Sequence, residues 1–155
     1  MLVPNWYRSV PLMLSLALLV PGAFAAAAGA GTVPDYSPPR GAYNAAVTQA
    51  NINQTICVRG WTKTVRPPRA YTDQLKRQQI AARHLPGPVG SYEEDHLIPL
   101  ELGGHPTDPN NLWPEPLDQA KRKDTLELGL NRAVCAGRMS LADARHKIAD
   151  PSLWQ

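Results

Sequence analysis

The sequence predicts a small α+β domain over residues 45–155, preceded by an N-terminal targeting segment and a flexible leader. The chain has 155 residues, of which 43% are apolar, so it can bury one core of modest size. Short segments of alternating apolar and polar residues precede longer segments with helical spacing and caps. The 16 Pro and 11 Gly residues require many loops and turns. A formal net charge of +3 excludes both an acidic tail protein and a strongly basic, histone-like protein.

Residues 1–25 have the layout of a secretory signal peptide. Arg8 supplies a weakly positive start, an apolar run covers residues 10–20, and small residues before position 26 fit a cleavage site. The run is shorter than the roughly 18–20 apolar residues that a membrane-spanning helix needs. We therefore expect a secreted or periplasmic protein with no stable membrane insertion after cleavage; the alternative is an uncleaved membrane anchor. Residues 26–44 are rich in Ala and Gly and then in Pro, which predicts a flexible leader.

Strands and loops are predicted from alternation and from turn residues. Residues 45–58 alternate weakly, which predicts a short strand or an irregular segment. Residues 61–66 alternate more regularly and predict a strand that ends at Pro67. Residues 86–90 are rich in Pro and Gly and predict a loop. Asp150-Pro151 begins a final turn, with Asp as the cap and Pro in the first position.

Helices are predicted from caps and from the spacing of apolar residues. Thr72 is a suitable cap for a helix over residues 73–83, which are rich in helix-forming residues. Apolar residues recur every four positions near the end of residues 117–134, as they do on one face of a helix. Ser140 is followed three positions later by an acidic residue, an arrangement that caps a helix over residues 141–149.

The two cysteines restrict the stabilising chemistry. Cys57 and Cys135 are too few for a four-cysteine zinc site or a disulfide-dense scaffold. Outside the cytosol, a disulfide between them is favoured over two buried free thiols. In the loop-entropy description, such a bond stabilises the fold by about 3–4 kcal/mol.

The chemically informative stretch is residues 92–104, with residues 108–114 after it. Asp95 and His96 are adjacent at the end of a short predicted strand. Because neighbouring strand residues point to opposite faces, a site that uses both requires the backbone to bend there. An imidazole titrates near neutral pH and can take a proton from water, which makes His96 a candidate general base. Carboxylates bind hard cations such as Mg²⁺, which makes Asp95 a candidate metal ligand.

The motif Asp95-His96-Leu97-Ile98-Pro99, followed by Gly103-Gly104 and then Asn111-Leu112, resembles that of the HNH endonuclease family. The resemblance covers about residues 90–130. It implies a ββα-metal finger, in which a two-stranded hairpin packs on a helix and holds one divalent metal ion. Mg²⁺ or Mn²⁺ is expected before Zn²⁺ or Ni²⁺. The segments around Cys57 and Cys135 are also similar to those of small exported bacterial members of this family.

The resemblance implies a role for each motif residue. His96 is the general base, Asp95 binds the metal ion, and a carbonyl group of Asn111 orients the ring of His96. The metal ion would polarise the phosphate and stabilise the departing 3′-oxygen. We therefore expect the functional atoms of these residues to converge within the reach of one hydrated cation.

One position departs from the family pattern. The family's third signature residue is a His or Asn on the helix, nine or ten residues after the position of Asn111, where this chain has Ala120 and Lys121. Neither is a usual ligand, since a lysine ammonium has no free lone pair. Asp118 and Gln119 are the alternative metal ligands if the helix begins slightly differently.

Basic residues near the motif predict contacts with nucleic-acid phosphates. They are Arg66 upstream and the run Lys121-Arg122-Lys123 downstream, with solvated surface charge as the alternative. No helix carries a pattern for reading base edges, so little sequence specificity is expected. The sequence thus predicts an exported, metal-dependent HNH-type endonuclease that cuts DNA in preference to RNA. The alternative is a non-catalytic exported module that binds nucleic acid or an envelope component on a degenerate HNH scaffold.

Overall fold

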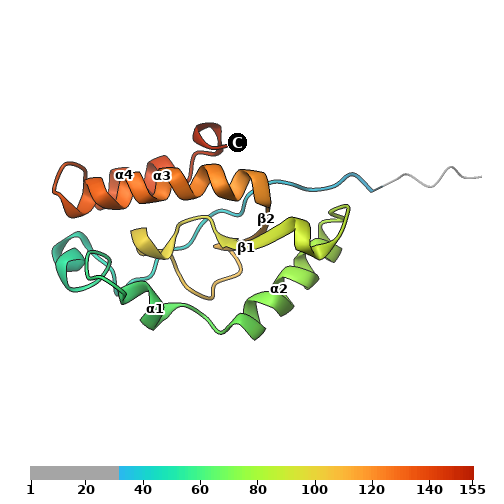
Figure 1. Cartoon of the computed structure of the whole chain (residues 1–155), viewed down its shortest axis with the longest axis horizontal. Helices are drawn as coiled ribbons and strands as arrows, with labels where there is room; N and C mark the ends of the chain where they lie inside the picture. Colours follow the sequence, from blue (N-terminus) through green and yellow to red (C-terminus); the bar gives the residue numbers. More distant parts are fainter. Residues whose placement is uncertain (1–31) are drawn as a thin grey trace, which may run out of the picture. The chain divides into compact units, whose positions relative to one another are not determined.

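A two-stranded antiparallel sheet lies between helices in the computed structural model, which describes residues 32–155 (Figure 1). Strand β1 (Tyr92–His96) pairs with β2 (Leu112–Pro116), so that His96 lies opposite Leu112. Helix α3 (Leu117–Cys135) follows β2 directly and packs against both strands. Helix α2 (Arg69–Ala82) also packs against both strands. This mixture of helices and a short sheet confirms the predicted α+β class.

The predicted signal peptide over residues 1–25 lies outside the described residues, as does the first part of the predicted leader. The later part of the leader is bonded to the domain. The backbone N–H of Gly41 donates to the carbonyl of Asn110 (2.8 Å), and that of Asn44 donates to the carbonyl of Gly103 (2.9 Å). The flexible leader predicted over residues 26–44 therefore extends too far, because these backbone groups find partners in the loop between the strands.

The strand predicted over residues 61–66 is wrong, because this segment forms the short helix α1 (Trp61–Val65). Trp61 and Val65 are both partly buried and lie four residues apart, so the alternation that predicted a strand also fits one face of a helix. Gly60 precedes the first turn with a φ of 86°, a conformation that favours glycine. Residues 45–58 contain no strand either, and include the 3₁₀ helix η1 (Gln49–Gln54).

Helix α2 is present as predicted but begins earlier, at Arg69. The hydroxyl of Thr72 donates to the carbonyl of Arg69 (3.0 Å) inside the helix and does not cap it. Pro68 precedes the first residue, and proline is well tolerated where a helix begins because its missing N–H is not needed there. Ile80 on α2 clusters with Leu85 and Tyr92, which fixes the helix against β1. The 3₁₀ helix η2 (Val89–Ser91) leads into β1.

The C-terminal elements confirm the predictions made from caps. Helix α4 (Leu141–Ile148) begins after Ser140, whose hydroxyl accepts a hydrogen bond from the N–H of Asp143 (3.0 Å). The 3₁₀ helix η4 (Pro151–Leu153) begins after Asp150, whose carboxylate accepts from the N–H of Ser152 (3.0 Å). Each contact joins residues that are close in the sequence, so a local pattern was sufficient to predict it.

The main core lies between α3, α4 and the loop that joins the strands, which contains the 3₁₀ helix η3 (Leu100–Leu102). Trp113 of β2 is buried there, with its ring centroid 6.1 Å from that of Trp154. The core also contains buried aliphatic residues from several elements: Val47, Leu97, Ile98, Leu102, Val134, Leu141 and Ile148. These core residues pack against the loop that joins the strands and so position the end of β1.

Cys57 and Cys135 form a disulfide, with their Cα atoms 5.5 Å apart. This confirms the predicted disulfide and ties the segment before α1 to the last residue of α3. None of the helices formed by residues 32–155 combines the length and the apolar character that crossing a bilayer requires.

Candidate functional site

The loop between the strands, residues 97–111, is held together by the buried side chain of Asn111. Its Oδ1 accepts hydrogen bonds from the N–H groups of Ile98 (2.9 Å) and Ala42 (3.3 Å). Its Nδ2 donates to the carbonyl oxygens of Ile98 and His105, each at 3.0 Å. A buried amide that uses all of these partners specifies one arrangement of the surrounding backbone. Asn111 therefore fixes the loop at the point where β1 ends.

The two motif glycines allow this loop to close. Gly103 has a φ of 70°, and a Cβ atom on Gly104 would lie 1.7 Å from the carbonyl oxygen of Ile98. Only a residue without a side chain fits at position 104, because the obstructing atom is backbone. The Gly103-Gly104 motif is thus explained by loop geometry.

The ring of His96 is held by the loop and not by Asn111. Its Nε2 lies 3.0 Å from the carbonyl oxygen of Pro106. Because a carbonyl oxygen only accepts, Nε2 carries the proton and Nδ1 keeps a free lone pair. The carbonyl of Asn111 accepts instead from the N–H of Leu97 (2.8 Å). The prediction that Asn111 orients the ring directly is therefore wrong, although Asn111 holds the loop that carries Pro106.

His96 is 4% exposed, yet its side chain borders two cavities. Burial lowers the pKa of His96, whereas the hydrogen bond to Pro106 and the charge of Asp95 act in the opposite direction. The net pKa is lowered, so the ring is neutral at neutral pH. The ring is therefore reached through the cavities, in a state that can accept a proton at Nδ1.

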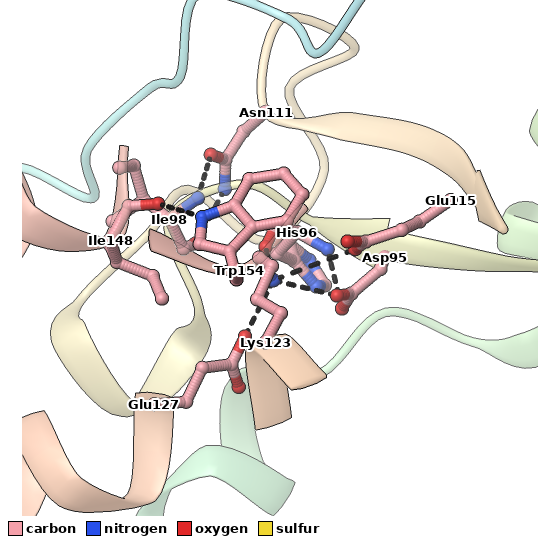
Figure 2. A network of polar contacts seen from close by, with 9 residues as sticks. All are labelled: Asp95, His96, Ile98, Asn111, Glu115, Lys123, Glu127, Ile148 and Trp154. Carbon is pink, nitrogen blue, oxygen red and sulfur yellow. Dashed lines mark hydrogen bonds and ion pairs between the residues drawn. The ribbon is translucent and has the colours of Figure 1, made fainter. Parts of the chain in front are cut away.

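A buried ammonium group joins the site to α3 (Figure 2). The side chain of Lys123 is 0% exposed, and its Nζ donates to Asp95 Oδ2 (2.7 Å), Glu127 Oε1 (2.6 Å) and the carbonyl of His96 (2.8 Å). The other carboxylate oxygen of Asp95 accepts from the N–H of His96 (2.7 Å). All three protons of the ammonium group thus have partners, and both oxygens of Asp95 are held.

This position of Lys123 corrects one prediction. Lys123 does not contact nucleic acid, because its charge is buried and needs the carboxylates that surround it. Lys121 and Arg122 lie on the solvent side of α3 and are exposed. Arg122 Nε also donates to the carbonyl of Trp154 (2.9 Å). Of the predicted basic run, two residues therefore remain candidates for phosphate contacts.

The carboxyl groups around Lys123 differ in their tendency to ionise. Burial opposes the ionisation of Asp95, but the charge and hydrogen bonds of Lys123 outweigh it and lower the pKa of Asp95. Glu115 Oε2 lies 3.8 Å from Lys123 Nζ, and burial, together with a hydrogen bond to Asp95, raises the pKa of Glu115 to about 9. Burial also raises the pKa of Glu127, to about 7. At neutral pH Asp95 is therefore anionic and Glu115 is protonated.

Asp95 and His96 both line a cavity of about 130 Å³, which we call the acidic cavity. Arg66 also lines it, and so do four further carboxylates, from Glu93, Glu101, Asp124 and Glu127. The structure thus brings together Asp95, His96 and Arg66 of the predicted site. It does not bring Asn111 to this cavity.

Asp124 of α3 lines the acidic cavity from an exposed position. The sequence analysis did not identify this carboxylate as a site residue. Asp124 follows Ala120 by four residues, so it lies one helical turn further along the same face. That spacing could have identified it. Neither of the predicted alternatives, Asp118 and Gln119, lines the cavity, and Asp118 instead lies 3.5 Å from Arg122 on the exposed side of α3.

The donor set of the acidic cavity fits a hydrated, hard divalent cation. Among residues 32–155, no three His, Cys, Asp or Glu side chains are already grouped as a metal site. Burial, followed by repulsion from Asp95, raises the pKa values of Glu93 and Asp124, so the cavity holds an excess of acidic oxygens. Mg²⁺ and Mn²⁺ prefer such oxygens, and Mg²⁺ keeps several of its waters. Zn²⁺ prefers Cys and His ligands, which fit this cavity less well.

No protein-family model, curated protein or solved structure matches the chain. The resemblance of residues 90–130 to HNH endonucleases therefore rests on the motif residues themselves. The placement of Asp95 and His96 at one cavity is the further observation that bears on function.

Proposed function

We propose that this chain is an exported, divalent-cation-dependent endonuclease of the HNH type, which hydrolyses phosphodiester bonds of DNA with little sequence specificity. The observation that carries the proposal is the position of His96. His96 lines the acidic cavity, and Nδ1 keeps its lone pair because the carbonyl of Pro106 holds Nε2. A general base, an anionic carboxylate and a guanidinium group at one small cavity are the groups that phosphodiester hydrolysis requires.

The order of the elements supports the same proposal. A hairpin of β1 and β2 leads directly into α3, which packs against both strands. Asp95 and His96 lie at the end of β1, and α3 places Asp124 at the same cavity. This arrangement is the one that a ββα-metal finger requires.

His96 would act as the general base. Its Nδ1 takes a proton from water while the water oxygen attacks the phosphorus atom. The bond between phosphorus and the 3′-oxygen breaks, and the 3′-oxygen gains a proton from solvent, which leaves 5′-phosphate and 3′-hydroxyl ends. Arg66 stabilises the negative charge on the phosphate during attack.

Asp95 and Asp124 would hold the divalent cation, largely through water. When bound, the cation polarises the phosphate and stabilises the departing oxygen. Lys123 keeps the carboxylate of Asp95 ionised and fixed in position. The disulfide between Cys57 and Cys135 supports export to an oxidising compartment.

A nicking assay tests this function. The mature protein is incubated with supercoiled plasmid and Mg²⁺ or Mn²⁺, with and without EDTA, alongside His96→Ala and Asp124→Asn. His146→Ala is the matched control, because His146 lies on α4 and is exposed. We expect nicking by the wild type and by the control, and its loss in EDTA and in His96→Ala. Nicking that survives both EDTA and His96→Ala contradicts the mechanism.

A second function is favoured by one observation, namely that both oxygens of Asp95 are already engaged by protein groups. In that case the chain is a non-catalytic exported module that binds nucleic acid on a degenerate HNH scaffold. Calorimetric titration with Mn²⁺ separates the two functions. An absence of Mn²⁺ binding by folded protein supports the module, and binding that Asp124→Asn weakens supports the nuclease.

A further inference from the structure

A second, larger cavity adjoins the acidic cavity. Its volume is about 450 Å³, and it lies between α2, the residues before α2, and β1. We call it the α2 groove. Arg66, Glu93 and His96 line both cavities, so the two meet at the ring of the proposed general base.

The wall that α2 forms carries two basic residues, Arg69 and Lys76, and one acidic residue, Asp73. Arg69, Thr72 and Lys76 of this wall are spaced as neighbours on one face of a helix. The surrounding sequence concentrates positive charge, because Asp73 is the sole acidic residue between positions 59 and 84. The basic residues of that segment are Arg59, Lys63, Arg66, Arg69, Lys76, Arg77 and Arg83.

The basic groups of this wall are free to meet an anionic ligand. The side chain of Arg69 is 92% exposed, and its pairing with Asp73 at 3.4 Å is on the surface, where ion pairs contribute little. Lys76 Nζ donates to the carbonyl of Tyr92 (3.0 Å), which leaves two of its protons for other partners. Arg66 is exposed at the end of the groove next to His96.

The opposite wall differs in charge. Glu93 and Glu94 of β1 line it, and burial raises the pKa of both, that of Glu94 to about 8, so this wall offers no cation and the attraction for a phosphate comes from α2. Arg69 and Lys76 are seven residues apart, which is about 10 Å along a helix axis. A stacked nucleic-acid strand carries one phosphate per roughly 3.4 Å of rise, so this distance corresponds to about three nucleotides.

We propose that the α2 groove binds the phosphodiester backbone of one nucleic-acid strand beside the bond that is cut. Arg69 and Lys76 contact phosphates of the flanking nucleotides, and Arg66 contacts the phosphate at His96. The strand lies with its phosphates toward α2 and its sugars and bases toward β1. The position of the cut bond in this inference rests on the proposed function, but binding in the groove does not.

The test measures binding separately from cleavage. The His96→Ala protein in EDTA is titrated with fluorescein-labelled single-stranded DNA, duplex DNA and RNA, and anisotropy is followed over a range of NaCl concentrations. The groove variant carries Arg69→Ala and Lys76→Ala. The matched control carries Arg77→Ala and Lys147→Ala, which remove the same charge from exposed positions that line neither cavity.

We expect the groove variant to bind single-stranded DNA at least about tenfold more weakly than the control. The slope of log Kd against log salt should fall by about 1.4, because two phosphate contacts of about 0.7 each are lost. Thermal melting of both variants is expected to equal that of the parent. A similar loss of affinity for duplex DNA or RNA also supports binding in the groove. The nucleic acid that binds most tightly is the one that the groove prefers.

The two proposals fail in different ways. If the wild type nicks plasmid but the groove variant binds as tightly as the control, the groove is excluded and the nuclease stands. If the wild type does not nick plasmid but the groove variant loses binding, the groove stands and the nuclease is excluded.

Discussion

Basic residues lie on both α2 and α3, and the two helices use them in opposite ways. On α2, Arg69 and Lys76 face the α2 groove, and the side chain of Arg69 is 92% exposed. On α3, Lys123 is completely buried while its neighbour Lys121 is exposed. Successive helix residues are turned by about 100°, so a run of three basic residues cannot form one charged face. The comparison teaches that the spacing of charges along a helix decides which of them serve a surface.

The basic residues of α2 and α3 also differ in the groups that surround each positive charge. The ammonium group of Lys123 is enclosed by Asp95, Glu127 and the carbonyl of His96, all within hydrogen-bond distance. The guanidinium of Arg69 has one exposed partner, Asp73. Substitution of the buried Lys123 should therefore reduce stability, whereas substitution of Arg69 or Lys76 should reduce ligand binding and leave stability unchanged.

The largest expected effect is the replacement of the buried lysine. Lys123→Met should lower the free energy of unfolding by about 3–5 kcal/mol, because it leaves the carboxylates of Asp95 and Glu127 buried without their cation. Lys121→Met should change it by less than about 0.5 kcal/mol. Urea unfolding followed by circular dichroism measures both. Equal stabilities of the two variants would show that the network around Lys123 contributes little.

The next effect is a pH dependence of the free energy of unfolding, which arises from Glu115 where the hairpin meets α3. Burial raises the pKa of Glu115 from 4.5 to about 9, so the folded protein keeps a proton that the unfolded chain releases. Between these pH values the folded state binds more protons, and stability therefore falls as pH rises. From pH 7 to 9 in EDTA, we expect the wild type to lose at least about 1.4 kcal/mol more than Glu115→Gln, the equivalent of one pKa unit. Parallel pH profiles for the two proteins would contradict the buried, protonated Glu115.

The smallest expected effect is on kcat/KM for nicking, in variants of an arginine at the site and of a surface lysine. Arg66 lines both cavities, so Arg66→Ala should lower kcat/KM for plasmid nicking by about tenfold or more through the loss of a charged contact with phosphate. Lys121→Ala should change kcat/KM by less than about threefold, and both variants should melt like the wild type. Initial rates at two salt concentrations provide the measurement. If Lys121→Ala is the more damaged variant, then nucleic acid binds on α3 and the contrast between the helices fails.

Much of this arrangement could be predicted where the decisive contacts are local. The caps at Ser140 and Asp150 were predicted because a side chain bonds to backbone a few residues away, and the extent of α3 because its apolar residues recur at helical spacing. The burial of Lys123 was not, because it depends on the packing of α3 against a strand that ends 27 residues earlier. The segment 61–66 was misassigned because a five-residue helix and a strand place Trp61 and Val65 in the same pattern.

Within the candidate site, the sequence predicted roles for Asp95, His96 and Arg66, which line one cavity, but did not predict the residues that hold them. The contact of His96 with Pro106 depends on the path of the loop, which the side chain of Asn111 fixes through backbone groups. No spacing rule encodes such a path. Asp124, by contrast, could have been identified from its distance of one helical turn from Ala120.

The proposed chemistry depends most on His96, whose ring must present an unprotonated Nδ1 to the acidic cavity. Long-range ¹H–¹⁵N NMR spectra of labelled protein at neutral pH distinguish the two ring nitrogens, and His96→Ala identifies the resonances. The structure predicts a proton on Nε2, none on Nδ1, and a pKa below the ordinary histidine value of 6.5. A proton on Nδ1, or a doubly protonated ring at neutral pH, would contradict the role of His96 as the base.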